Sequence, residues 1–308
     1  MISQRDLEQL VETARPTTQQ GKVAEYIPAL AKADSGDLAV AIYTKNGEFV
    51  SAGNDETQFT LQSVVKVLML ALAIMDRGKD YVFERVGMEP TGDPFNSIAK
   101  LETRVPSKPL NPMINAGALA VSDMLIGLSS DDKLGRLLAF IHELSGNSAI
   151  RYNNKVAESE FRTAHLNRSL CYFMKQHGII TEEVEKTIDF YTKACAIEVN
   201  CRDLSRIGAV LANNGEDPNT NKKIVPDPIV RIVKTFMVTC GMYNASGEFA
   251  MKVGIPAKSG VSGAILGSVP EGGGIGIYGP ALDEKGNSVA GVKLMELLSA
   301  QYDLSIFS

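Results

Sequence analysis

Strand-like segments lie near both ends of this 308-residue chain, and helical segments fill the region between them. Residues 38–53, LAVAIYTKNGEFVSAG, alternate apolar and polar positions around Asn46-Gly47, which predicts a β-hairpin. Strand-like text returns in AKSGVSGAILGSVP and GGIGIYGP, and a turn at DEKGN precedes a last helix from about Ser288. Early and late strands most simply share one antiparallel sheet. The pattern therefore predicts an α+β fold with a helical lobe rather than a doubly wound parallel sheet.

We expect one domain over residues 1–308. Its α/β part should comprise about 20–62 and 225–308, and its helical part about 63–224. The segment SEFRTAHLNRSLCYFMKQHG is an example of the helical text, with Gly178 as a plausible cap.

Charge and apolar patterning exclude several classes of partner. The net charge of −5, without any lysine- or arginine-rich run, argues against nucleic acid and anionic membranes. The longest apolar run, Val67–Met75, is far too short for a membrane span, and the first 16 residues predict an amphipathic helix rather than a secretory signal. Four cysteines without a Cys-x-x-Cys pair indicate buried thiols in a reducing, cytoplasmic protein.

The segment from Ser63 to Met75 is apolar except at Ser63 and Lys66. Residues three apart on a helix lie on one face, so these two side chains are neighbours. Burial disfavours a charged lysine and lowers its pKa, and the positive end of a helix acts in the same direction. Such a lysine can take the proton of a nearby hydroxyl and convert a serine into a nucleophile. The alternative is a lysine that extends to water.

Ser-x-x-Lys is a short pattern, and this chain contains it three times. Ser97/Lys100 follows turn-like text and Ser130/Lys133 lies among serines and aspartates, so we interpret both as solvated surface. A second element favours the first pair. Lys258-Ser259-Gly260 opens a late strand, and a lysine-hydroxyl-glycine strand beside a Ser-x-x-Lys helix is typical of penicillin-binding proteins and serine β-lactamases. The bland alternative is an ordinary strand.

Other chemistries have weaker support. The G-x-G-x-x-G pattern at residues 274–279 lies in strand-like text ended by Pro280, whereas a dinucleotide site needs a helix there. His142, His165 and His177 lack the spacing of metal ligands, and the chain has neither a Walker loop nor a G-x-S-x-G elbow.

Several longer segments carry a family resemblance: GKVAEYIPALA, FTLQSVVKVL, GDPFNS, NPMINAGALAV, SEFRTAHLNR, YTKACAIEVNC, CGMYNASGEFA and GIPAKSGVSG. With these, the chain resembles bacterial glutaminases of the serine-dependent family that has the β-lactamase and penicillin-binding-protein fold. The segments run from residue 21 to residue 263 in family order, and NPMINAGA and GMYNASGEFA distinguish glutaminases from other enzymes of that fold.

The resemblance implies that Ser63 attacks the side-chain amide of L-glutamine with Lys66 as its partner, and that water then hydrolyses the acyl-enzyme. Backbone N–H groups of Ser63 and Val261 would form the oxyanion hole. Tyr191 and Tyr243 could relay protons with Lys66, and the sequence does not say which tyrosine does which task. The positions that match glutamine-binding positions are Tyr26, Gln62, Ser63, Asn115, Glu160, Asn167, Tyr191, Tyr243 and Val261.

In this comparison Glu160 would meet the substrate ammonium, and Asn115 and Asn167 would donate to its carboxylate. The resemblance implies no metal and no organic cofactor, and it implies a homo-oligomer, commonly a tetramer. Two rival functions stay open. One is a hydrolase acting on a β-lactam or peptide with the same pair, and the other is a non-catalytic amino-acid sensor.

Overall fold

The computed structural model describes residues 2–25, 27–92, 94, 96–103, 107–270 and 272–308, except the side chains of residues 99 and 100. Its main sheet has five antiparallel strands in the order β2-β1-β7-β6-β5. The strands are β1 Ala39–Tyr43, β2 Phe49–Ala52, β5 Ala257–Ser259, β6 Ala264–Val269 and β7 Gly273–Tyr278. Strands from both ends of the chain therefore share one antiparallel sheet, which confirms the predicted α+β class.

A second, two-stranded sheet lies between the main sheet and the helices. It pairs β3 Phe59–Thr60 with β4 Glu198–Val199. The predicted hairpin is confirmed, since β1 pairs with β2 in the register Tyr43 to Phe49 and Gly47 has a φ of 82°. Glycine adopts this left-handed backbone at little cost.

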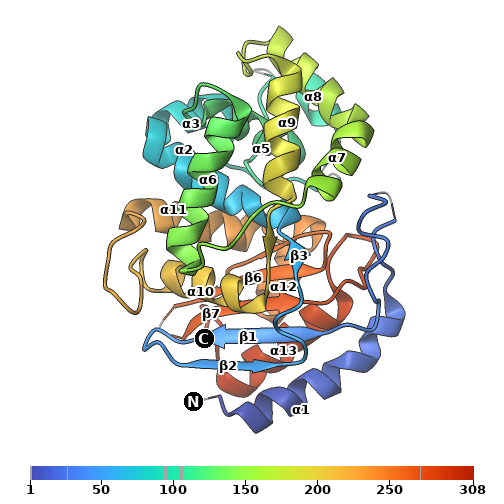
Figure 1. The fold of residues 1–308 in the computed structure, drawn as a ribbon, viewed down its shortest axis with the longest axis vertical. Helices are drawn as coiled ribbons and strands as arrows, with labels where there is room; N and C mark the ends of the chain where they lie inside the picture. Colours follow the sequence, from blue (N-terminus) through green and yellow to red (C-terminus); the bar gives the residue numbers. More distant parts are fainter. Residues whose placement is uncertain (1, 26, 93, 95, 104–106, 271) are drawn as a thin grey trace.

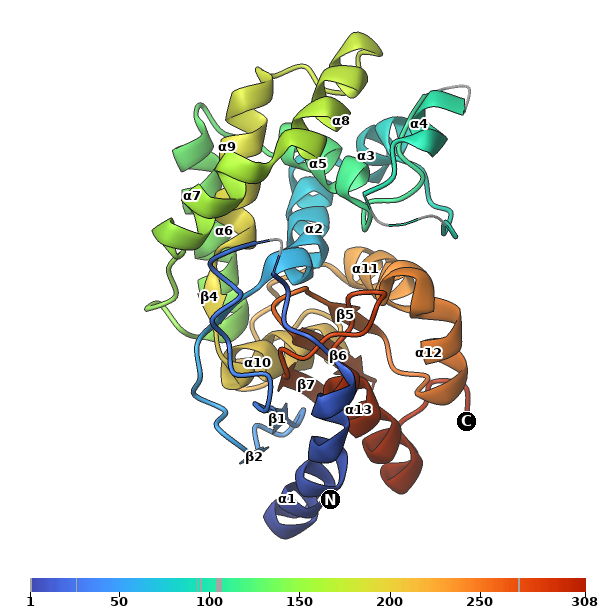
Figure 2. The same ribbon diagram turned by 90° about the vertical axis from the view of Figure 1, so that its right-hand side faces the viewer.

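Helices cover both faces of the main sheet (Figure 1). Helices α1 and α13 lie on one face, and α10 lies on the other, between the sheet and the helical lobe (Figures 1 and 2). Helix α10 falls within residues 63–224, so part of that range packs on the sheet. The bounds of these and the C-terminal helices are α1 Gln4–Ala14, α10 Cys201–Ala212, α11 Asp227–Cys240, α12 Ser246–Lys252 and α13 Val289–Tyr302.

The helical lobe gathers around α2, the apolar helix of the sequence analysis. Its helices are α2 Val65–Arg77, α3 Lys79–Arg85, α4 Ala99–Thr103, α5 Asn115–Met124, α6 Ser130–Ser145, α7 Asn154–Thr163, α8 His165–Gln176 and α9 Val184–Cys195. Short 3-10 helices are η1 Arg15–Gln20, η2 Gln62–Val64 and η3 Tyr243–Ala245. Among the described residues, no helix is both long and apolar enough to cross a membrane.

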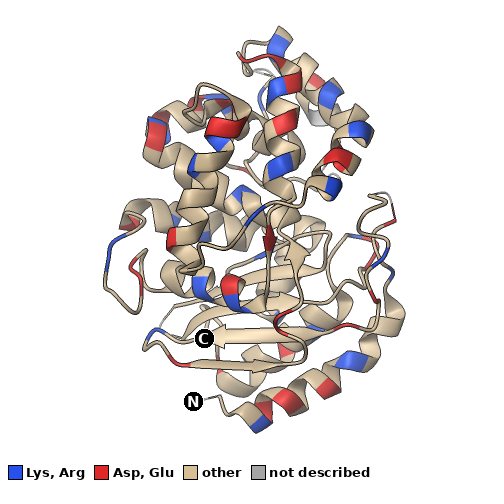
Figure 3. Ribbon diagram, viewed as in Figure 1, with Lys and Arg blue, Asp and Glu red and all other residues tan. Residues whose placement is uncertain are grey.

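Alternation along β7 explains how α10 approaches the sheet. Ile275 and Ile277 point into the core on the α13 side, and the intervening positions are Gly274 and Gly276. A Cβ on Gly274 would lie 1.9 Å from the carbonyl oxygen of Ser205 in α10. Residues 274–278 of the glycine pattern therefore lie in a strand, as predicted. The face that carries Gly274 and Gly276 packs against α10. Figure 3 shows β6 and β7 without charged residues, as two covered faces require.

Candidate active site

Ser63 lies in η2, at the junction between β3 and α2. Gln62, immediately before it, has a φ of 47°, which is uncommon for a residue with a side chain. The loop after β5 fixes this segment. The Ser262 hydroxyl donates to the carbonyl oxygen of Thr60 at 2.6 Å, and a Cβ on Gly260 would lie only 2.6 Å from the carbonyl oxygen of Leu61. Glycine at position 260 therefore lets the late strand approach the backbone that carries Ser63.

Lys66 lies in the first turn of α2 and is only 1% exposed, so it does not extend to water. Its Nζ donates to the carbonyl oxygen of Met113 at 3.2 Å and to Oδ1 of Asn115 at 2.7 Å. Burial lowers the pKa of Lys66 to about 8, although Cys195 and the Glu160 carboxylate oppose this shift. Such a group is partly neutral near physiological pH.

A chain of amides extends from Lys66 along the pocket. Asn115, the first residue of α5, donates from Nδ2 to Oδ1 of Asn167 on α8 at 3.1 Å. The turn before α5 is closed by Asn111, whose Oδ1 accepts the backbone N–H groups of Met113 and Ile114. This turn places both the carbonyl of Met113 and the amide of Asn115 beside the lysine.

Glu160 lies on α7 and is half-buried in the pocket wall. Nε2 of Gln62 lies 3.5 Å from its Oε2. Burial raises the pKa of Glu160 to about 7, and the contact with Gln62 and the charge of Lys66 oppose the shift. The segment expected to continue as one helix is interrupted at Ala164, where α7 ends and α8 begins. The interruption brings Glu160 and Asn167, from two helices, to one pocket.

The two tyrosines have different partners. Tyr191 on α9 is 2% exposed and pairs with the Cys195 thiol one turn later; burial raises the pKa of Tyr191 well above its usual value. Tyr243 in η3 has a φ of 51°, and burial raises its pKa, while the nearby hydroxyls of Ser63 and Ser259 oppose that rise.

Lys258 is fully buried on the far side of Tyr243, with Nζ 4.3 Å from the ring centroid. This ammonium donates to the carbonyl oxygens of Gly241 and Ser259 at 2.9 and 2.6 Å. Burial and the charge of Lys66 lower the pKa of Lys258 well below its usual value.

These groups surround a cavity of about 340 Å³. Seven residues predicted from the sequence line it: Gln62, Ser63, Asn115, Glu160, Asn167, Tyr191 and Val261. Tyr243 lies near Ser63, and Tyr26 lies outside the described residues. A larger hollow of about 530 Å³ lies beside α11, but none of the residues reported to line it was predicted, so we assign the chemistry to the smaller one.

Sequence reasoning missed six of the described lining residues: Ile27, Asn96, Thr163, Ala164, Leu166 and Cys195. Thr163 and Cys195 are the ends of α7 and α9. Cys195 carries a usable signal, since it is spaced one helical turn from Tyr191. For Ile27 and Asn96 the sequence offers no comparable signal.

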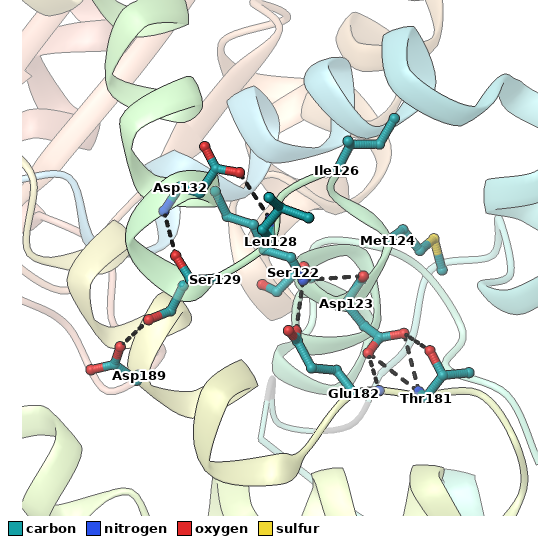
Figure 4. Close-up of polar contacts among 12 residues, drawn as sticks. Ser122, Asp123, Met124, Ile126, Leu128, Ser129, Asp132, Thr181, Glu182 and Asp189 are labelled. Carbon is teal, nitrogen blue, oxygen red and sulfur yellow. Dashed lines mark hydrogen bonds and ion pairs between the residues drawn. The ribbon is translucent and has the colours of Figure 1, made fainter.

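The surface interpretation of the third Ser-x-x-Lys pair is wrong (Figure 4). Lys133 is 4% exposed, and its Nζ donates to the Glu182 carboxylate at 2.6 Å and to the carbonyl oxygens of Ser122 and Asp123. The Ser130 hydroxyl donates instead to Asp189. Lys133 therefore links the start of α6 to the loop before α9 through its contact with Glu182. For the second pair, the side chain of Lys100 is not among those described.

Comparisons with known proteins agree with this geometry. The family model for glutaminase matches residues 21–307. Glutaminase 1 of Halalkalibacterium halodurans is 64% identical over 301 residues, which cover 98% of both chains. The glutaminase of Geobacillus thermodenitrificans is 62% identical over 307 residues, 100% of this chain and 99% of that one.

Solved structures give the same result. A probable glutaminase of Bacillus subtilis superposes with a TM-score of 0.93 at 41% identity, covering 99% of this chain and 97% of the other. A covalent complex of Bacillus subtilis glutaminase with 5-oxo-L-norleucine, formed by reaction with 6-diazo-5-oxo-L-norleucine, superposes with a TM-score of 0.91 at 40% identity over 99% of both chains. The fold is therefore the β-lactamase-like fold of these enzymes, and the chain belongs to the glutaminase family.

Proposed function

We propose that this glutaminase hydrolyses the side-chain amide of L-glutamine to L-glutamate and ammonia through an acyl-enzyme on Ser63. One observation carries the assignment of the nucleophile. Lys66 is fully buried one turn after a serine at the wall of the cavity. Among the described residues its Nζ has two hydrogen-bond acceptors, the number of N–H groups of a neutral amine. The covalent complex of the Bacillus subtilis glutaminase with 5-oxo-L-norleucine supports covalent chemistry in this family.

The polar groups of the cavity suit the two ends of free glutamine. Glu160 would bind the α-ammonium, and Asn115 and Asn167 would donate to the α-carboxylate, so that one carboxylate meets the one cation. Gln62 bridges toward Glu160 and would hold that carboxylate in place. The side-chain amide would then reach Ser63, with the N–H groups of Ser63 and Val261 around its oxygen.

Proton transfer follows from the bonds of Lys66. A neutral lysine has two N–H groups and one lone pair, and the two N–H groups are occupied by Met113 and Asn115. The lone pair can receive the proton of Ser63 as its Oγ attacks the amide carbon. The tetrahedral intermediate then expels ammonia, which takes up that proton, and water attacks the ester with the same base.

Tyr243 is the better candidate for the relay between serine and lysine, because its hydroxyl lies near Ser63. Tyr191 pairs with Cys195 and faces the cavity, which suits a substrate contact. A raised tyrosine pKa is compatible with a relay in which the hydroxyl gives and receives a proton together and never becomes a free phenolate.

The deciding experiment measures ammonia release from glutamine and from asparagine, and the colour change of a chromogenic cephalosporin, with wild type and Ser63→Ala. Release from glutamine that vanishes in a folded Ser63→Ala protein supports the proposal. Cleavage of the cephalosporin favours the β-lactam hydrolase, and saturable glutamine binding without release favours the sensor. Undiminished turnover by Ser63→Ala refutes the serine mechanism.

We also propose that residues 1–308 act as one catalytic domain, because the cavity draws residues from η2, the helical lobe and the loop after β5. Four free, buried cysteines support a reducing, cytoplasmic setting. Large exposed apolar side chains, Leu128 and Met251 among them, support a homo-oligomer, which we propose to be a tetramer. Light scattering at several protein concentrations tests this assembly.

A further inference from the structure

The turn at residues 283–287, between β7 and α13, is closed by its own hydrogen bonds. The Asp283 carboxylate accepts the backbone N–H groups of Lys285 and Asn287, both at 2.9 Å. The backbone N–H of Asp283 donates in turn to the carbonyl oxygen of Asn287 at 2.8 Å. Gly286, at the bend, has a φ of 91°. Such a turn holds its side chains in fixed directions.

The side chain of Asn287 leaves this turn toward η3. Asn287 is 1% exposed, and its Nδ2 donates to the carbonyl oxygen of Met242 at 3.2 Å. Met242 is the residue before Tyr243. On the other side, the Ser246 hydroxyl donates to the carbonyl oxygen of Tyr243 at 2.8 Å and accepts the N–H of Met242 at 3.0 Å. Side chains therefore hold the backbone both before and after Tyr243.

The same turn also lies near the side chain of Tyr243. A Cβ built on Gly286 would lie 3.5 Å from Cε2 of Tyr243 and 3.6 Å from Cγ1 of Val261, so a side chain at this position would contact both. Tyr243 and Val261 belong to one small apolar cluster with Leu282 and with Ile27, which lines the substrate cavity. One short turn thus lies next to both the Tyr243 ring and the proposed oxyanion residue Val261.

Tyr243 needs such support because its φ of 51° is unfavourable for a bulky side chain. We propose that Asn287, with the bend at Gly286, is a positioning residue that holds the backbone of η3 so that the Tyr243 side chain stays beside Ser63. This inference rests on the proposed role of Tyr243 in proton relay. A positioning role affects the chemical step more than the binding of glutamine, whose ammonium and carboxylate meet other residues.

The test compares Asn287→Ala with Ser299→Ala. Ser299 is also buried, and its hydroxyl likewise donates to a backbone carbonyl, that of Val253 at the other end of α12. We expect both variants to lose similar thermal stability. Only Asn287→Ala should lose kcat, by about tenfold or more, because a displacement on the order of 1 Å at a reacting group has that effect, while KM stays within about twofold. Wild-type kcat in Asn287→Ala overturns the inference.

A double-mutant cycle with Tyr243→Phe separates this inference from the proposed function. If Asn287 acts through the hydroxyl, adding Asn287→Ala to Tyr243→Phe should lower kcat no further. A full additional loss refutes the positioning role and leaves the role of Tyr243 standing. Wild-type turnover by Tyr243→Phe alone overturns both. If Asn287→Ala does not fold, Gly286→Ala tests the same turn, with Gly178→Ala, at a φ of 70° and with open space around it, as the control for backbone strain.

Discussion

Glu160 and Lys66 should together set the pH dependence of turnover. Each charge affects the other: the Lys66 ammonium lowers the pKa of Glu160, and the Glu160 carboxylate raises the pKa of Lys66. Burial outweighs these effects and brings the pKa values to about 7 for Glu160 and about 8 for Lys66. Glutamine binding needs an ionised Glu160, and attack by Ser63 needs a neutral Lys66. Both requirements favour higher pH.

The expected size of the effect follows from these two pKa values. The fraction of enzyme with an ionised Glu160 and a neutral Lys66 is about 0.45 at pH 8, about 0.05 at pH 7 and about 0.001 at pH 6. The value of kcat/KM should therefore fall about tenfold from pH 8 to pH 7 and about fiftyfold from pH 7 to pH 6. The steepening below pH 7 is the signature of the carboxyl group.

Glu160→Gln removes the carboxyl group and should leave a single tenfold fall per pH unit. Its midpoint should lie below 8, because the charge that raised the pKa of Lys66 is gone. Loss of a charge-assisted contact to the ammonium, about 1.5–3 kcal/mol, should raise KM roughly 10- to 150-fold. Glu158→Gln, the same change at an exposed position of α7, should leave both values as in wild type.

Glutamate formation is measured by stopped assays in a mixed buffer at constant ionic strength, since salt changes electrostatic interactions. Initial rates over a range of glutamine concentrations give kcat and KM separately at each pH. A wild-type profile without steepening below pH 7 would refute the pairing of the two groups. So would a Glu160→Gln profile that keeps the double slope.

Three further outcomes test packing and reactivity. Lys133→Met should lower the free energy of unfolding by about 3 kcal/mol, measured by urea titration, because it leaves the Glu182 carboxylate unpaired, and kcat/KM should not change. Gly274→Ala should prevent accumulation of folded protein, judged by circular dichroism and solubility, because its Cβ would overlap α10. The control Gly135→Ala, which has open space around it in α6, should raise the free energy of unfolding by about 0.5–1 kcal/mol. Iodoacetamide at pH 7.5 should leave the intact mass of the native protein unchanged, since all four thiols are buried and burial raises their pKa values; alkylation without denaturant would contradict this.

The sequence carried the local parts of this structure well. A two-residue turn such as Asn46-Gly47 fixes a hairpin from its own backbone preferences, so β1 and β2 were predictable. Ser63 and Lys66 were also predictable, because a lysine is rarely buried in an apolar helix unless it has a partner or a function there. In each case the relevant neighbours are within a few residues.

Contacts between distant segments were not predictable from pattern alone. The text around Lys133 is rich in serine and aspartate, and the side chain is buried only because α9 and its preceding loop cover it. The interruption at Ala164 lacks proline and glycine, so no local signal marked it. The acceptors of Lys66 come from about 50 residues away, through a turn closed by Asn111. Tertiary packing decided all three.

Backbone strain in the described chain points to the same place as the chemistry. Five residues other than glycine have a positive φ, and three of them are asparagine or aspartate, which tolerate that conformation. The other two are Gln62 and Tyr243. Gln62 directly precedes Ser63 in the chain, and Tyr243 lies near the Ser63 hydroxyl. Each such position costs on the order of 1–3 kcal/mol and persists only where surrounding contacts hold it. Hydrogen bonds hold both positions. Gln62 contacts Thr60 and Glu160, and the backbone of η3 is bonded to Asn287 and Ser246. Both strained positions therefore lie beside Ser63, and we expect a substitution that relaxes either one to weaken catalysis before it weakens the fold.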